Sequence, residues 1–156
     1  DITNDLEIKG EIFSYLGHLN GINDNLTVGQ NLKFWFDILG EPNISFFKTL
    51  KIENIINKKL SYCSVGQKRL VGLVRMFNSQ KKILLMDEPT VSLDRENKEL
   101  VVEQINKHKK NGGISIIISH DEFPCEKSIT LKYDPKTQKS ALDTRFEPSL
   151  KSRTKG

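Results

Sequence analysis

Ile83-Leu84-Leu85-Met86-Asp87-Glu88-Pro89 is the stretch that decides how this sequence is interpreted. Four apolar residues are followed at once by two acidic residues. Such a run predicts a buried strand of a parallel sheet, with both carboxylates at the carboxyl edge, where α/β sheets bind ligands. At that edge Asp87 can coordinate Mg²⁺ and Glu88 can polarise a water molecule. Because acidic residues are also common at solvated strand ends, this pair alone leaves both interpretations open.

Strands and helices alternate on both sides of this run. Short apolar runs predict further buried strands at residues 12–16 and 114–119, and an edge strand at 127–133. Helical periodicity and capping residues predict helices at residues 27–39, 43–59, 66–77 and 95–109. The alternation predicts an α/β fold with a doubly wound parallel sheet and a helical segment between its strand-bearing parts.

Length and composition exclude several classes of protein. The chain has 156 residues, which suits one domain, and it contains no run of about 18 apolar residues that would cross a bilayer. Its two cysteines, Cys63 and Cys125, lack the spacing of a zinc finger or a disulfide scaffold. Of the net charge of +4, residues 134–156 carry six basic and three acidic side chains. The nearly neutral remainder argues against a nucleic-acid surface, and we expect 134–156 to be a loose basic tail.

Two further groups of polar residues follow predicted element boundaries. Ser64, Gly66 and Gln67 precede or begin a helix, whose N-terminus favours an anion, although a Ser-x-Gly is also an ordinary helix cap. His120 and His18 each follow a buried strand. A histidine there can donate to a phosphate oxygen, although a lone histidine is more often structural or exposed.

The order of these motifs carries more information than each one alone. Along the chain they are Ser64-Val65-Gly66-Gln67, Arg75, Asp87-Glu88, Ser92-Leu93-Asp94 and His120. Over about residues 12–133 this order closely resembles the ATP-binding-cassette (ABC) ATPase family. The resemblance implies a P-loop NTPase-like sheet with an inserted helical subdomain at about 27–70, within a partial ABC domain at 1–133.

The resemblance also implies roles for individual residues. It makes 63–67 the signature motif, in which Ser64, Gly66 and Gln67 bind nucleotide, and it makes Ser92, Leu93 and Asp94 the D-loop. Asp87 would be the Walker B aspartate that holds Mg²⁺, Glu88 the catalytic glutamate and His120 the switch histidine. His18 would occupy the nucleotide-facing position of the Q-loop glutamine.

Within the family, Tyr15-Leu16-Gly17-His18 resembles the haem-exporter ATPases of cytochrome c maturation. This implies an enzyme that hydrolyses ATP with Mg²⁺ and pairs head to tail with a second ABC ATPase subunit. It also implies integral membrane partners contacted through the helical part around Trp35. The expected location is the surface of an inner membrane, on the mitochondrial matrix side or the bacterial cytoplasmic side.

Two departures from the family pattern leave alternatives open. The sequence contains no Gly-x-x-x-x-Gly-Lys-Ser/Thr phosphate loop (Walker A), which the family places before the Q-loop, and only 17 residues precede His18. We therefore expect an N-terminal strand–loop–helix unit to be missing, either by truncation or because another gene encodes it. In the signature, Cys63 replaces Leu and Val65 replaces Gly. The alternatives are a non-catalytic subunit that lends its signature in trans, an ABC ATPase with another cargo, and a decayed fragment. The sequence indicates neither cargo nor direction of transport.

Overall fold

The computed structural model describes residues 12–40, 44–120, 123, 128–134 and 139–145. The chain divides into two compact units, Asp1–Asp121 and Glu122–Gly156, and each is described by itself.

A parallel three-stranded sheet is the centre of the first unit. Its strands are β1 (Phe13–Leu16), β2 (Ile83–Asp87) and β3 (Ile114–Ile118), in the order β1-β2-β3. In register, Tyr15 pairs with Leu85 and Leu85 with Ile116, so these three side chains share one face of the sheet. The three predicted strands are therefore confirmed, and so is the α/β class.

Three longer helices follow the sequence pattern closely. They are α2 (Val28–Leu39), α4 (Val65–Asn78) and α5 (Arg95–Lys110). Thr27 caps α2, as predicted, in a capping box with Gln30, and the chain leaves the helix at Gly40 with φ of 93°. Asp94 caps α5 by accepting a hydrogen bond from the backbone of Asn97. Each helix therefore begins where a side chain satisfies its first N–H groups.

The predicted helix at 43–59 takes a different form. It begins as α3 (Ile44–Thr49) and then gives way to two 3₁₀ turns, η1 (Ile52–Ile55) and η2 (Leu60–Tyr62). Lys51 adopts a left-handed conformation, with φ of 53°, which ends the α-helical run. Beyond it, the carbonyls of Ile56 and Lys58 accept hydrogen bonds from the start of α2. Tertiary pairing with α2 thus replaces the local helix that periodicity favours.

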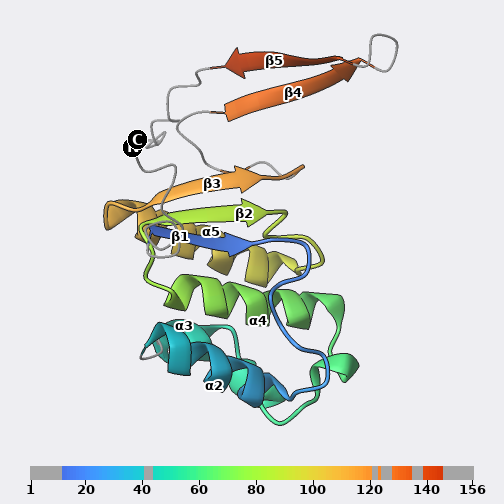
Figure 1. Ribbon diagram of the computed structural model, residues 1–156, viewed down its shortest axis with the longest axis vertical. Helices are drawn as coiled ribbons and strands as arrows, with labels where there is room; N and C mark the ends of the chain where they lie inside the picture. Colours follow the sequence, from blue (N-terminus) through green and yellow to red (C-terminus); the bar gives the residue numbers. More distant parts are fainter. Residues whose placement is uncertain (1–11, 41–43, 121–122, 124–127, 135–138, 146–156) are drawn as a thin grey trace, which may run out of the picture. The chain divides into compact units, whose positions relative to one another are not determined.

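Helix α4 forms the middle of the first unit. It lies between the sheet and α2 in Figure 1, whereas α5 lies behind the strands. Along α4, Val71, Leu73, Val74 and Met76 are all fully buried. The sheet buries the face that carries Leu84 and Met86, while Ile116 on the opposite face is 53% exposed. The core of this unit is therefore a helix-covered face of a small parallel sheet.

The second unit contains an antiparallel pair, β4 (Ser128–Asp134) and β5 (Lys139–Arg145). Strand β4 matches the predicted edge strand at 127–133 within one residue at each end. Strand β5 lies inside the segment 134–156 that we expected to be loose, and residues 146–156 lie outside the described residues. Among the described residues of the whole chain, no helix combines the length and apolarity needed to cross a bilayer.

Candidate functional site

The carboxyl edge of the sheet brings Asp87, Glu88 and His120 together. The Glu88 carboxylate accepts two hydrogen bonds, from the backbone N–H of His120 at 3.0 Å and from the Ser119 hydroxyl at 3.1 Å. The His120 ring is exposed, and its Nε2 lies 3.8 Å from Glu88 Oε1. Residues that follow β2 and β3 therefore meet at the edge, as the parallel arrangement predicts.

The backbone of Glu88 is in an uncommon conformation. Its φ is 49°, in the left-handed region, where a residue with a Cβ pays roughly 1–2 kcal/mol. Its N–H donates to the carbonyl of Ile118 at 2.8 Å, and its carbonyl accepts from the Arg69 guanidinium at 2.7 Å. Hydrogen bonds on backbone and side chain together hold this residue in its strained turn.

The motif Ser64–Gln67 forms the start of α4. Ser64 and Gln67 make a reciprocal capping box, with Ser64 Oγ accepting from the Gln67 N–H and Gln67 Oε1 accepting from the Ser64 N–H. Lys58 Nζ also donates to Gln67 Oε1, at 3.3 Å. Val65, which occupies the first position of the helix, is 65% exposed. The cap is therefore intact, and a branched side chain faces outward beside it.

Gly66 lies directly against the loop 92–94. A Cβ on Gly66 would collide with the carbonyl oxygen of Ser92, whose φ of 62° is also left-handed. Leu93 is 8% exposed and anchors this loop, and Asp94 begins α5. Glycine is required at 66 because the two backbones approach too closely for any side chain. This contact explains the two motifs together better than the helix cap alone.

The same residues line a hollow of about 420 Å³ beside η1. Its motif residues are Ser64, Gly66, Gln67, Ser92, Leu93 and Asp94. Glu88 and His120 are absent from the described lining. The structure thus forms two separate groups, which we name the carboxylate group (Asp87, Glu88, His120) and the signature group (Ser64–Gln67 with 92–94).

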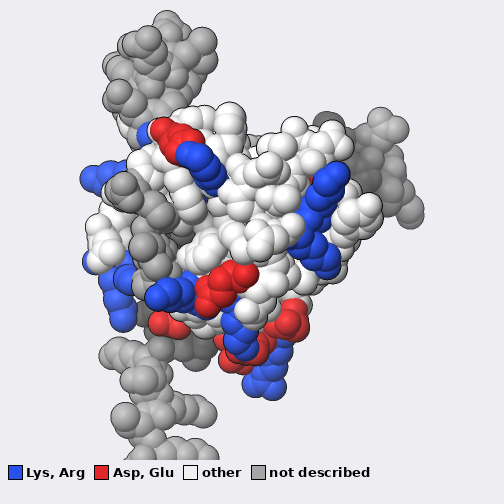
Figure 2. All heavy atoms as spheres, turned by 90° about the horizontal axis from the view of Figure 1, so that it is seen from below, with Lys and Arg blue, Asp and Glu red and all other residues white. Residues whose placement is uncertain are grey.

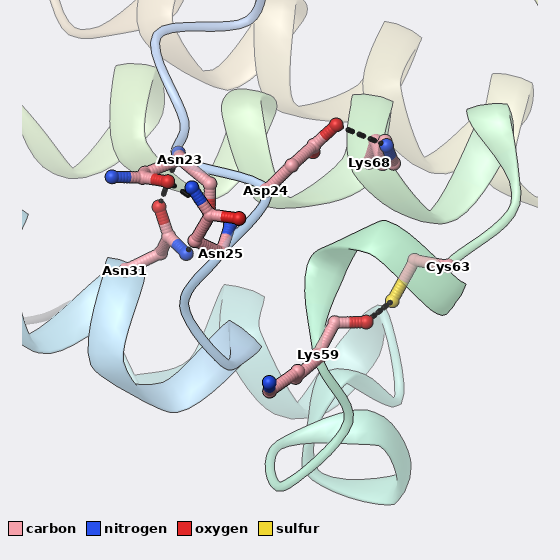
Figure 3. A network of polar contacts seen from close by, with 7 residues as sticks. All are labelled: Asn23, Asp24, Asn25, Asn31, Lys59, Cys63 and Lys68. Carbon is pink, nitrogen blue, oxygen red and sulfur yellow. Dashed lines mark hydrogen bonds and ion pairs between the residues drawn. The ribbon is translucent and has the colours of Figure 1, made fainter.

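A polar network ties the loop before α2 to the first turn of α2 and to the first turns of α4 (Figure 3). The buried Asn31 side chain accepts from the Asn23 N–H at 2.7 Å and donates to the Asn23 carbonyl at 2.9 Å. Lys68 of α4 pairs with Asp24 at 2.7 Å, and the Cys63 thiol donates to the Lys59 carbonyl at 3.6 Å. These contacts lie on both sides of Ser64 in the sequence, at Cys63 and at Lys68.

His18 lies in the turn that follows β1 and is exposed. No described hydrogen bond or ion pair places its ring on the carboxylate group. Its neighbours in the same turn, Gly17 and Asn20, are bound by the guanidinium of Arg69, which also binds the backbone of Asp87 and Glu88. The Arg69 side chain therefore links the turn of His18 to the backbone of the carboxylate group.

Sequence reasoning missed Arg69 and Ser119 as parts of this site. A charged residue on the apolar face of a predicted helix was the available signal for Arg69. Ser119 ends a predicted strand beside His120, but its contact with Glu88 depends on the pairing of β2 with β3.

The chain is similar to known proteins both in sequence and in fold. A family model described as ABC transporter matches residues 1–91 of the chain. The chain belongs to the ABC transporter family. Its fold is correspondingly that of the ABC ATPases: a dimeric ATP-binding cassette, solved in a post-hydrolysis state bound to ADP and Pi, superposes with a TM-score of 0.60. That structure is 22% identical in sequence, and the match covers 76% of this chain and 57% of the cassette.

Two curated relatives narrow the comparison within the ABC family. The cytochrome c biogenesis ATP-binding export protein CcmA of Paracoccus denitrificans is 33% identical over 131 residues, which are 83% of this chain and 62% of that protein. CcmA of Chelativorans sp. is 36% identical over 133 residues, 79% of this chain and 66% of that protein. This ABC chain therefore spans just under two thirds of the length of both relatives.

Carboxylate oxygens such as those of Asp87 are suitable ligands for a hard divalent cation. Asp87 ends β2 and so places its carboxylate at the carboxyl edge of the sheet. Magnesium is commonly bound through one or two carboxylates together with phosphate oxygens and water. No three His, Cys, Asp or Glu side chains gather as a metal-binding group in the described part of the chain. A magnesium ion at this edge would therefore need ligands besides the Asp87 carboxylate, such as phosphate oxygens and water.

Proposed function

We propose that this chain is the ATP-binding subunit of an ABC transporter and that it couples ATP hydrolysis to haem export for cytochrome c biogenesis. The observation that carries the proposal is the Glu88 carboxylate, held by Ser119 and His120 at 3.1 and 3.0 Å beside the end of β2. A carboxylate fixed in this way is pre-oriented to act on one water molecule.

Each residue of the carboxylate group has a distinct role in this proposal. Glu88 orients and polarises the attacking water, and Asp87 binds Mg²⁺ through one oxygen. When bound, Mg²⁺ supplies charge neutralisation for the phosphates. His120, whose ring is exposed next to Glu88, donates to the γ-phosphate, and His18 reaches the same phosphate region from the turn after β1.

The signature group acts on a nucleotide held by a second ABC ATPase subunit. Its separation from Glu88 and His120 in the hollow beside η1 supports two different nucleotides as their targets. The exposed N-terminus of α4 favours the negative charge of a phosphate. The dimeric cassette bound to ADP and Pi supports a head-to-tail pair as the functional unit.

The relatives support the cargo and the location. Both are named as cytochrome c biogenesis export proteins of bacteria, which favours haem as cargo and the cytoplasmic face of a bacterial inner membrane as the location. A mitochondrial location has no support from these two bacterial proteins.

Helix α2 is our candidate contact for the membrane subunits. Its outer side exposes Phe34 by 55% and Ile38 by 60%. Seen from below in Figure 2, charged side chains of both signs surround a largely uncharged centre. These two apolar side chains, beside the exposed Lys33–Asp37 ion pair, suit a protein partner better than they suit water.

The test is Mg-ATP hydrolysis by the chain purified from membranes together with its co-purifying subunits. We expect Glu88→Gln to retain Mg-ATP binding and to lower kcat about 100-fold or more, because the general base is removed. Glu99→Gln is the matched control, since Glu99 is an exposed residue of α5 that pairs only with Arg95 in the described structure. The proposal is wrong if Glu88→Gln and Glu99→Gln hydrolyse ATP equally fast.

Covalent haem staining of c-type cytochromes tests the cargo separately. Cells that carry only the Glu88→Gln chain are expected to lose stained c-type cytochromes, while cells with Glu99→Gln keep them. If Glu88→Gln abolishes ATP turnover but c-type cytochromes stain normally, the chain is an ATPase whose cargo is not haem.

A further inference from the structure

Arg69 is a buried charge at the junction of three segments. It lies five residues after Ser64 on α4 and is 2% exposed. One guanidinium nitrogen, Nη1, donates to the Gly17 carbonyl at 2.8 Å and to Asn20 Oδ1 at 2.5 Å. The other, Nη2, donates to the carbonyls of Asp87 and Glu88. One side chain thus joins the signature helix, the turn of His18 and the carboxylate group.

Burying this guanidinium is costly. Desolvation lowers the pKa of Arg69, and the negative charges of Asp87 and Glu88 raise it in part. Its Nε has no hydrogen-bond partner among the described residues. Removing an ion from water costs several kcal/mol, and an apolar residue of similar volume often stabilises a fold equally well. Core packing alone therefore does not account for an arginine at this position.

Two of the hydrogen bonds of Arg69 bind the backbone of Asp87 and of the strained residue Glu88. Glu88 is left-handed, so its carbonyl turns toward α4 and meets Nη2 at 2.7 Å. The opposite side of Glu88 is held by the Ile118 carbonyl, Ser119 and His120. Arg69 holds the Asp87–Glu88 turn from the side of the signature helix.

We propose that Arg69 is a positioning residue, which sets the backbone of Asp87 and Glu88 relative to the signature group and to the turn of His18. It does not bind nucleotide itself. Without it, the strained turn relaxes and the Glu88 carboxylate loses its alignment, while the groups that bind nucleotide stay in place. This inference rests on the proposed ATPase function for its kinetic consequence, but its structural consequence is independent of that function.

The variants are Arg69→Met and Arg69→Lys, with Arg75→Met as matched control. Arg75 lies on the same helix, and burial lowers its pKa too. Its guanidinium binds the Tyr15 carbonyl at 2.6 Å and covers the Trp35 ring at 4.8 Å, away from the carboxylate group. The control therefore removes a half-buried guanidinium of the same helix, and its described contacts do not include Asp87 or Glu88.

Kinetics of the purified complex give the first readout. We expect Arg69→Met to lower kcat about 100-fold, as a displacement of about 1 Å can do, with KM for ATP within about twofold of the wild type. Arg69→Lys should restore part of kcat, because one ammonium replaces some of the four hydrogen bonds. Equal kcat losses in Arg69→Met and Arg75→Met would overturn the proposal.

Amide hydrogen exchange of the full chain gives a second readout that needs no turnover. After correction for the unfolding free energy of each variant, exchange in residues 87–91 should be faster in Arg69→Met than in Arg75→Met. If Arg69→Met does not fold, Arg69→Lys takes its place in the same comparison. Unchanged exchange at 87–91 would reduce Arg69 to a packing residue. If the wild-type complex does not hydrolyse ATP, the proposed ATPase function is wrong. Amide hydrogen exchange at 87–91 then still tests the positioning role of Arg69.

Discussion

At the scale of single residues, the chemistry depends on Glu88. Its backbone lies in a region that costs a non-glycine residue roughly 1–2 kcal/mol, and this cost is offset by hydrogen bonds with Arg69, Val91, Ile118, Ser119 and His120. The same hydrogen bonds leave the carboxylate one orientation. Strain and alignment at this residue thus have a common origin.

Gly66 gives a direct test of the contact between the signature group's two segments. Gly66→Ala gains up to about 1 kcal/mol of helix propensity. The added Cβ would collide with the Ser92 carbonyl, and overpacking against backbone typically costs about 1–3 kcal/mol. We therefore expect a net loss of stability, measured as a lower midpoint of urea denaturation.

The neighbouring Val65→Ala serves as control for this measurement. Val65 is 65% exposed, so its truncation should change the unfolding free energy by no more than about 0.5 kcal/mol. A Gly66→Ala chain as stable as the wild type would show that 92–94 moves aside freely.

At the scale of elements, capping residues were sufficient to predict where the long helices α2 and α4 begin. Thr27 and Ser64 begin α2 and α4 with complete capping boxes. Local patterns were insufficient to predict the structure of residues 43–59. There Lys51 is left-handed, and the carbonyls that follow it accept hydrogen bonds from the start of α2. Those hydrogen bonds join residues far apart in sequence, so the local spacing of apolar residues does not predict them.

The cap of α2 provides a quantitative test at this scale. Thr27→Ala removes the oxygen that accepts the Gln30 N–H at 3.1 Å, and we expect a loss of about 1 kcal/mol in unfolding free energy. Urea denaturation followed by circular dichroism measures it. Ser61→Ala, at an exposed position of η2, is the control and should be neutral. A neutral Thr27→Ala would mean that water replaces the cap.

At the scale of the whole molecule, the sheet of the first unit has two unlike faces. One face packs on helices, whereas the other exposes Tyr15 by 59%, Ile114 by 52%, Ile116 by 53% and Ile118 by 67%. The register places Tyr15 and Ile116 in one row across β2. An apolar surface of this kind promotes association in water.

We therefore expect the chain purified alone to associate with increasing concentration. Ile116→Thr keeps a β-branched residue on the strand while lowering apolar exposure, so it should weaken the association without loss of stability. Sedimentation velocity over a concentration series measures this. Val91→Thr, at a 45% exposed position outside the sheet, is the control. Equal association of Ile116→Thr and the wild type would exclude this face as its cause.

The sequence by itself determined the α/β class, the three strands, the long helices and the order of the motifs. These features depend on apolar period, caps and short polar motifs, all of which are local properties of the chain. Only the tertiary structure decided that Ser119 and Arg69 hold Glu88, that Gly66 meets Ser92, and that residues 43–59 break into turns. Each of these depends on contacts between segments distant in sequence. Those contacts form when β1, β2 and β3 pair into a sheet and α4 packs against it.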